Sequence, residues 1–275
     1  MASFSIVNNI SSVNAQAKLY ETNVSLGNTL GRLSSGLRIT QSSDDAAGLA
    51  VANSFRSDVS ILTVGVRNAN DGLSKLQVAD SALNNISNLL DRAAVLATQS
   101  ASEGFKGSRT VLNNEFAIVL DEIDREAGIG SLTTASSYSV YISRDGANGI
   151  VGVSYGSATS AALNLSTTTI DTASNSQTAL VTITNAITSL GSLQGTVGSA
   201  QNRLAFAIEI AQSQIVSKTA AQSRIRDANM AEETASLTRF NILNQSGMAA
   251  LAQADQSSAA VLVLLRSSSE ESLSE

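Results

Sequence analysis

Apolar residues recur at alternating steps of three and four along both ends of this chain, near residues 5–125 and 175–265. Such spacing predicts helices that pack along a heptad seam. The first seam runs through Ile6, Ile10, Val13, Ala17, Tyr20 and Val24, and after a one-residue shift through Leu26, Leu30, Leu33 and Leu37. Ser34-Ser35-Gly36 then offers a break. A second helix is expected to begin at Ser43 or Asp44, where a short polar side chain can accept from free backbone N–H groups.

This second helix is predicted over residues 46–101, because the same rhythm runs from Phe55 to Ala97. Its expected buried positions are Phe55, Val59, Leu62, Val66, Ala69, Leu73, Leu76, Leu83, Ile86, Leu90, Ala93 and Ala97. Gly65 and Gly72 lie inside it, and each costs about 1 kcal/mol relative to alanine, so we expect them to allow close packing against a neighbouring helix. Residues 103–109 predict a loop, and Arg109–Glu126 predicts a helix that is stopped by Gly128 and Gly130.

The middle of the chain has a different pattern. Tyr138–Ser143 and Ile150–Tyr155 are rich in β-branched and aromatic residues, and the Gly-rich segment Arg144–Gly149 lies between them. This arrangement predicts a β-hairpin. Leu163–Ile170 is expected to add a strand. Serine and threonine crowd the same region, which a flexible surface loop would also explain.

The second helical arm begins near Ser176 and predicts one long helix over residues 176–226. Residues 227–265 predict a further amphipathic helix, with Gly247 as the place for a bend. The last nine residues, Ser267–Glu275, are rich in Ser and Glu and are predicted to be disordered. Together these elements predict a mainly α fold: a long antiparallel helical rod or coiled coil with both termini at one end, plus a small β-hairpin region in the middle of the chain.

The composition favours a structural role over catalysis. The 275 residues include no histidine, no cysteine and no proline, and the net charge is −6. The chain therefore lacks imidazole bases, thiol nucleophiles and the usual zinc ligands, and we expect no cofactor and no metal. No basic stripe interleaved with aromatic residues indicates nucleic-acid binding, and no apolar window reaches the roughly 18 residues of a membrane helix. The N-terminus also lacks the basic start and apolar run of a cleaved secretory signal.

Two groups of carboxylates could carry chemistry. Asp44 and Asp45 are adjacent, as general acid–base or metal chemistry would require, but they lie at a predicted helix start, where a capping role is favoured. Glu122, Asp124 and Glu126 surround Arg125, which indicates a solvated or helix-pairing face rather than a cation site. We therefore expect no catalytic residues and no enzyme.

One set of motifs is highly specific. Residues 32–39 (Arg-Leu-Ser-Ser-Gly-Leu-Arg-Ile), 44–52, 70–74 and 77–83 resemble the N-terminal signature of bacterial flagellin. Residues 200–204, 223–232, 243–247, 251–255 and 261–266 resemble its C-terminal half, in order and spacing. The motif residues that carry this resemblance are Arg32, Gly36, Arg38, Asp44, Asp45, Gly48, Asn70, Asp71, Gly72, Gln201, Asn202, Arg203, Arg224 and Asp227.

The resemblance implies a structural subunit that self-assembles into the extracellular bacterial flagellar filament for motility. It implies that residues 1–43 and 227–266 pair as inner-tube helices. Residues 44–130 and 175–226 would form the surrounding rod, and residues 131–174 a shortened outer surface. The residues expected to form the assembly seam are Ile6, Ile10, Val13, Leu30, Leu33, Leu37, Leu251, Val261, Leu264 and Leu265. Because isolated helices are marginal in water, residues 1–40 and 230–275 are predicted to be disordered in the monomer and helical after assembly.

The resemblance also implies partners. The chain would leave the cell unprocessed through the flagellar type III apparatus, with an export chaperone bound at about residues 230–266. Filament cap and hook–filament junction proteins would contact the polymer. In many flagellins a rod surface binds an innate immune receptor, and Arg92 and Leu96 match the receptor-facing segment here. Ala94 and Val95 replace the family's usual Arg-Glu pair, so we expect weakened recognition.

Three other kinds of protein share some of these sequence features. A hook–filament junction protein shares the helical ends but polymerises only into a short collar, and the long run of C-terminal motifs favours flagellin over it. A flagellin with a zinc protease in its variable region would need His-Glu-x-x-His, and this chain has no histidine. A secreted adhesin or signalling ligand could coexist with filament formation.

Overall fold

A computed structural model of the chain describes residues 9–271, and it describes the side chains of these residues except at 147 and 257–271. Five long helices and one short hairpin account for the regular structure of this part of the chain. The chain divides into two compact units. Unit 1 combines residues 1–55 with 220–275, and unit 2 comprises residues 56–219. The mainly α fold with a small central hairpin is therefore as predicted.

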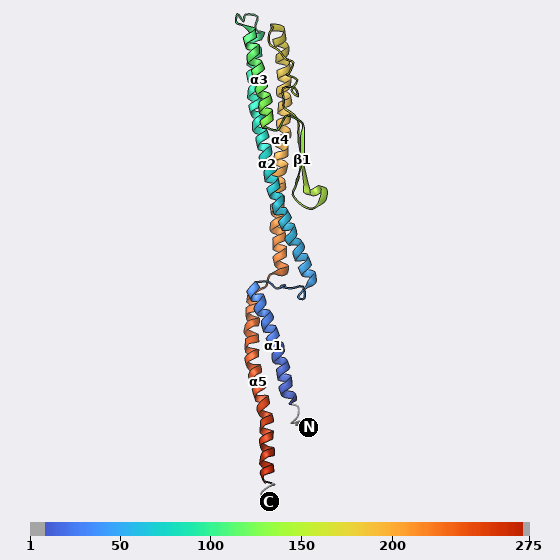
Figure 1. The fold of residues 1–275 in the computed structure, drawn as a ribbon, viewed down its shortest axis with the longest axis vertical. Coiled ribbons are helices and arrows are strands. Elements are labelled where there is room, and N and C mark those ends of the chain that lie inside the picture. The colour runs from blue at the N-terminus through green and yellow to red at the C-terminus, as the bar shows by residue number, and fades with distance from the viewer. Residues whose placement is uncertain (1–8, 272–275) are drawn as a thin grey trace. The chain divides into compact units, whose positions relative to one another are not determined.

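Unit 1 is built on an antiparallel pair of helices, α1 (Ile10–Ser35) and α5 (Met230–Glu271), which lie side by side in Figure 1. Asn9 donates from Nδ2 to the carbonyl oxygen of Ala254 over 2.9 Å, so the described start of the chain lies against the C-terminal part of α5. Further along, Arg32 lies 3.6 Å from Glu233. As the residue numbers rise along α1, those of the facing residues on α5 fall by about the same amount, as an antiparallel coiled coil requires.

The end of α5 differs from the prediction. The helix continues to Glu271, so residues 267–271 are helical where the sequence predicted disorder, and residues 272–275 lie outside the described residues. No glycine or proline interrupts this segment, and serine and glutamate are tolerated in helices. Gly247 does not end the helix, because α5 runs through it without a break. Leu19 of α1 instead packs at Gly247, where a Cβ atom would lie 3.1 Å from its Cδ1.

Unit 2 is a bundle of three helices that share one hydrophobic core (Figure 1). These are α2 (Ala46–Ala101), α3 (Arg109–Ile129) and α4 (Ala173–Arg226), of which α2 and α4 also supply their first and last turns to unit 1. The bounds of α2 match the prediction, whereas α3 runs through Gly128 to Ile129 and is capped by Gly130. The core is rich in small and aliphatic side chains, including the fully buried Leu76, Leu83 and Leu90.

The boundaries between the units fall inside α2 and α4 rather than near residues 44 and 226, where the sequence placed them. The first turns of α2 pack on the connection that precedes it, because a Cβ atom at Gly48 would lie 3.0 Å from Cδ1 of Ile39. Ala52, one turn later, is also buried. These contacts make the start of α2 part of unit 1.

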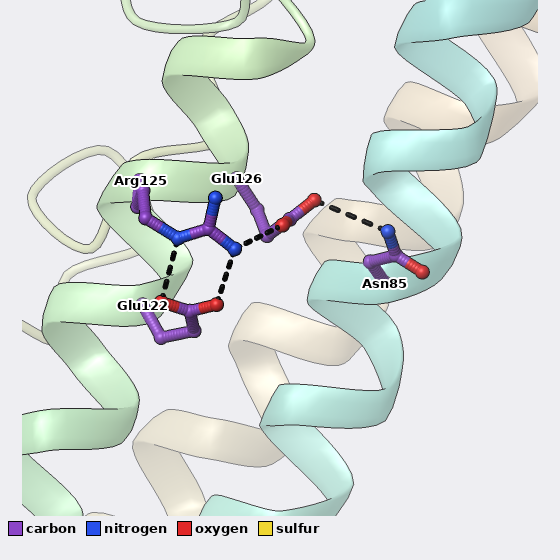
Figure 2. A network of polar contacts seen from close by, with 4 residues as sticks. All are labelled: Asn85, Glu122, Arg125 and Glu126. Carbon is purple, nitrogen blue, oxygen red and sulfur yellow. Dashed lines mark hydrogen bonds and ion pairs between the residues drawn. The ribbon is translucent and has the colours of Figure 1, made fainter.

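A polar network joins α3 to α2 within unit 2 (Figure 2). Glu126 is buried on α3 and accepts from Nδ2 of Asn85 on α2 over 3.1 Å and from Nη2 of Arg125 over 2.7 Å. Arg125 also donates from Nε to Glu122 over 2.8 Å, and this hydrogen bond lowers the pKa of the Glu122 carboxyl. The acidic stretch thus pairs helices, which is one of the two roles favoured from the sequence.

The hairpin consists of β1 (Ser136–Tyr141) and β2 (Ile150–Tyr155), joined by the 3-10 turn η1 (Gly146–Gly149). The strands are antiparallel, with Ser136 opposite Tyr155 and Tyr141 opposite Ile150. The predicted hairpin is therefore correct. The predicted strand over Leu163–Ile170 is wrong: Leu163, Leu165 and Ile170 are buried, but turns hold them, with Leu165 N donating to Ser160 O over 2.8 Å. Asn164 has a φ of 57°, which a strand does not allow.

Candidate assembly surface

The segment between α1 and α2 is paired with the segment between α4 and α5 by backbone hydrogen bonds. Arg38 N donates to Arg226 O over 2.6 Å, and Ala228 N donates to Gly36 O over 2.9 Å. The guanidinium of Arg38 also donates from Nη2 to the carbonyl oxygen of Ile225 over 2.9 Å. Two chain segments nearly 190 residues apart in sequence are thus joined at one crossing, which we call the connector clamp (residues 36–45 and 225–229).

Several family-motif residues build this clamp. Gly36 ends α1 in the left-handed region, with a φ of 71°, and its N–H donates to Arg32 O. Glycine is the residue that adopts this conformation without steric cost, which explains the motif at this position. Asp227 accepts from the hydroxyl of Ser223, while Arg224 is exposed.

The adjacent carboxylates have two different roles. Asp45 accepts from Gly48 N over 2.9 Å and caps the start of α2. Asp44 instead accepts from Thr40 N, Thr40 Oγ1 and Gln41 N at 2.9–3.1 Å. The backbone N–H of Thr40 is the largest cause of a lowered pKa of Asp44, followed by the N–H of Gln41. The predicted capping is thus confirmed for Asp45, while Asp44 holds the connection itself.

The other motif residues lie in unit 2. Gln201 donates from Nε2 to Leu76 O over 3.3 Å and so joins α4 to α2, and Asn70 donates to Val66 O within α2. Gly72 is buried beside the hairpin, where Tyr138 Oη donates to its carbonyl oxygen over 3.1 Å. The remaining three, Asp71, Asn202 and Arg203, are exposed.

The predicted assembly seam lies mainly on the surface of unit 1. Ile10, Val13 and Leu30 are 64%, 62% and 47% exposed, whereas Leu33, Leu37 and Leu251 are half-buried. Ile6 lies outside the described residues, as do the side chains of Val261, Leu264 and Leu265. Among the described side chains of α1, Thr29 is the one that is buried, and the described side chains of α5 include none. The pair therefore has almost no core of its own, and a large apolar surface faces outward.

Arg92 and Leu96, the two residues matched to a receptor-facing segment, have different environments. Arg92 is partly exposed and forms an ion pair with Glu115 of α3. Leu96 is 1% exposed and lies in the core of unit 2, so it forms no part of the surface. The resemblance matched both residues to one receptor-facing segment, but Leu96 is buried in the core that α2, α3 and α4 share.

A buried carboxylate was missed from the sequence. Asp58 of α2 is 8% exposed and lies 2.6 Å from Nζ of Lys218 on α4 and 2.9 Å from Nε of Arg144, next to the hairpin turn. The sequence showed only a single aspartate, because its two partners are 86 and 160 positions away. In the described part of the chain, no cluster of three or more candidate metal ligands occurs, and no helix meets the length and hydropathy needed to cross a membrane.

The chain matches known proteins over most of its length. The model of the bacterial flagellin N-terminal helical region matches residues 6–130, and that of the flagellin C-terminal helical region matches residues 180–265. A flagellin from Halalkalibacterium halodurans is 34% identical over 86% of this chain and 90% of its own length. The flagellar filament 33 kDa core protein of Treponema phagedenis is 33% identical over 95% of this chain and 99% of its own length. The chain is also similar to the flagellin in the crystal structure of Bacillus cereus flagellin, with 26% sequence identity and a TM-score of 0.46. That match covers 52% of this chain and 88% of the other.

Family membership gives the role of the chain as a whole. Flagellins are structural proteins rather than enzymes, and their subunits assemble with one another into an extracellular filament. The chain belongs to the bacterial flagellin family, and it is a self-assembling structural subunit of the flagellar filament.

Proposed function

We propose that α1 and α5 form the innermost layer of the filament, with residues 44–130 and 175–226 as the surrounding rod and residues 131–174 as the outer face. The observation that carries this proposal is the exposure of large apolar side chains on both terminal helices. Tyr20 and Val24 of α1 are 73% and 47% exposed, and Ile242 of α5 is 60% exposed. Neighbouring subunits would remove these side chains from water, and each buried Leu-sized side chain contributes about 1.5–3 kcal/mol.

A cryo-EM reconstruction of the assembled polymer tests this arrangement. The density of the innermost layer is expected to fit residues 10–35 and 230–256. An innermost layer built from any other segment would contradict the proposal. The same grids distinguish a filament subunit from a junction protein, because the purified chain seeded with filament fragments should grow long tubes rather than short collars.

We further propose that the chain is exported unprocessed through the flagellar type III apparatus, with an export chaperone bound at residues 230–266. Family membership supports the route, and the exposed apolar side chains Ile242, Leu243 and Met248 support the docking region. Replacing Ile242 and Leu243 by serine should weaken chaperone capture at least tenfold. Phe206→Ser, which removes an equally exposed apolar side chain from α4, should leave capture unchanged. Equal loss in both variants would argue against docking on α5.

Once exported, the subunits would meet the cap at the growing end and the hook–filament junction proteins at the base. The proposal places these contacts on the ends of the polymer, where the same surfaces of the subunit remain without a neighbouring copy. Binding of purified cap or junction protein to filament ends, and not to filament sides, would be the expected result in electron microscopy. Uniform decoration along the filament would contradict it.

Recognition by the innate immune receptor should be weak. Arg92 is on the surface, but Val95, which is 56% exposed, replaces a charged residue that is usual in the family, and Ala94 replaces its neighbour. A reporter-cell assay with purified monomer should give a response well below that of a typical flagellin. The double variant Ala94→Arg/Val95→Glu should raise it. Full activation by the unmodified monomer would refute the proposal.

A further inference from the structure

Helix α1 carries two heptad seams on opposite faces. One seam faces α5, and its residues are half-buried or buried: Ser12, Ala15, Leu19, Thr22, Leu26, Thr29 and Leu33. The other follows the same three-four rhythm, shifted by two positions, and all of its residues are exposed: Ile10, Val13, Ala17, Tyr20, Val24, Gly27 and Gly31. A shift of two residues turns the helix by about 200°, so this outer seam points away from α5.

The two glycines of the outer seam have no role within the chain. A Cβ atom at Gly27 or Gly31 would meet nothing within 4 Å, and neither residue has a positive φ. Glycine is among the least favourable residues for a helix interior, so its presence at two positions one turn apart needs another cause. Gly247 shows what such a glycine can do in this protein: it lies on the inner face of α5 and lets Leu19 of α1 approach closely.

The outer face of α5 offers a matching surface. Its exposed residues recur with the same spacing on the side opposite to α1: Ala235, Thr238, Ile242, Gln245, Ala249 and Ala252. Four of these six side chains are Ala or Thr, and Ile242 is the one large apolar residue among them. The outer seam of α1 has the complementary pattern, with large side chains in its first half and glycines in its second. Neither seam contains a charged residue, as expected for surfaces that become buried.

We infer that the outer seam of α1 packs on the outer face of α5 from a second copy of the chain, with the two helix backbones closest at Gly27 and Gly31. The inference rests on the proposed role of α1 and α5 as the innermost layer, and it specifies which faces meet there. A heptad seam is the pattern that another helix fills. Contact between the α1 helices of two copies, parallel and unshifted, would instead set Val13 and Tyr20 against their own equally large counterparts, without the small residues that α5 provides.

Substitution of the glycines separates this role from simple helix stability. The double variant Gly27→Ala/Gly31→Ala should increase the helicity of the full-length monomer, because alanine favours the helix. The same variant should raise the critical concentration for seeded filament growth at least tenfold, because two methyl groups occupy the space of the neighbouring helix. Asn14→Ala, on the flank of α1 between the two seams, should leave growth unchanged. Growth of the double variant at the wild-type critical concentration would overturn the inference while leaving the filament function intact. If the wild-type chain itself forms no tubes, the proposed function fails as well.

Cross-linking identifies the partner helix directly, because the chain contains no cysteine of its own. Chains with Ala17→Cys are mixed with chains that carry one cysteine at Ala235, Ala249 or Ala252, assembled and oxidised. At least one mixture should give a disulfide-linked dimer of the two variants in filaments and none in monomers, since a disulfide requires Cα atoms within about 7 Å. Thr22→Cys, on the inner seam, should give no such dimer with the same partners. Links between two Ala17→Cys chains without any link to α5 would overturn the assignment of the partner face.

Discussion

The Cβ position of Gly65 in α2 lies 2.0 Å from the backbone carbonyl oxygen of Ile142, at the end of β1. The backbone of the hairpin segment thus rests directly on the backbone of the helix. A real Cβ atom at this position would collide with backbone rather than with the end of a flexible side chain, so the hairpin would have to move. The position of the hairpin against α2 therefore depends on the absence of a side chain at residue 65.

Replacing Gly65 by alanine is expected to destabilise unit 2 by about 1–3 kcal/mol, which is the usual cost of overpacking. This loss should exceed the gain of about 1 kcal/mol in helix propensity. Chemical denaturation of the full-length monomer measures the net change, and hydrogen exchange should show it first in residues 136–155.

Gly191→Ala is the matched control, since it changes the same residue type in a long helix. A Cβ atom at Gly191 would meet nothing within 4 Å, so this variant should gain about 0.5–1 kcal/mol. Equal stability of the Gly65→Ala and Gly191→Ala variants would show that the contact between Gly65 and Ile142 does not affect the free energy of unfolding.

Asp58 should be a second point on which the hairpin depends. Its carboxylate contacts cations from two other segments, Arg144 and Lys218, and its side chain is only 10% exposed. Asp58→Asn removes the negative charge beside two positive ones and should cost about 1–3 kcal/mol in the free energy of unfolding. Asp91→Asn, which removes an exposed carboxylate from the same helix, should change stability by less than about 0.5 kcal/mol. A similar loss in both variants would indicate a general charge effect and no specific role for Asp58.

The helices could be predicted from the sequence because their periodicity is long and uninterrupted, and the bounds of α2 followed from it directly. The buried face of α2 was placed less well. The observed seam passes through Gly65 and Gly72, while Val66 and Leu73 of the heptad pattern are only half-buried. Close packing against a helix was expected at both glycines, but the nearest neighbours are Ile142 at Gly65 and Val140 at Gly72, both from the hairpin segment. Glycine carries no hydrophobic signal, so the pattern of apolar residues cannot show where the hairpin approaches a helix.

Some residues of the candidate assembly surface could likewise be identified from the sequence, and others could not. The motif residues and the exposed positions Ile10 and Val13 were identified from the sequence, because each lies within a recognisable local pattern. The hydrogen bonds of Arg38 and the ion pairs of Asp58 were not, since they join residues more than 80 positions apart. Leu96 was matched to a receptor-facing surface through the family motif, and a motif does not show which residues of α2 the other helices of unit 2 cover.

The connection held by Asp44 should respond to acid. Hydrogen bonds from Thr40 and Gln41 lower the pKa of Asp44 in the folded chain. Its stabilising effect is therefore present above the ordinary pKa of aspartate, about 3.9, and is lost as the pH falls through the lower folded value. Hydrogen exchange of residues 40–45 in the wild type should increase only below about pH 4. Asp44→Asn should show fast exchange already at neutral pH, with little further change in acid. Asp71→Asn, with the same change of net charge, should retain the wild-type acid response.

The terminal helices should be ordered mainly by assembly. The described side chains of α1 and α5 include one buried residue, Thr29, while unit 2 has a continuous core. Isolated helices gain little stability without packing, so residues 10–35 and 230–256 should exchange their amide hydrogens rapidly in a dilute monomer. In filaments the same amides should be protected by at least a hundredfold, since the outer surfaces of both helices are then covered. The helices of unit 2 serve as the internal control, because their core is complete within one chain and their protection should be similar in both states. Strong protection throughout α1 and α5 in the dilute monomer would show that the antiparallel pair is stable by itself, and that assembly covers a surface that is already formed.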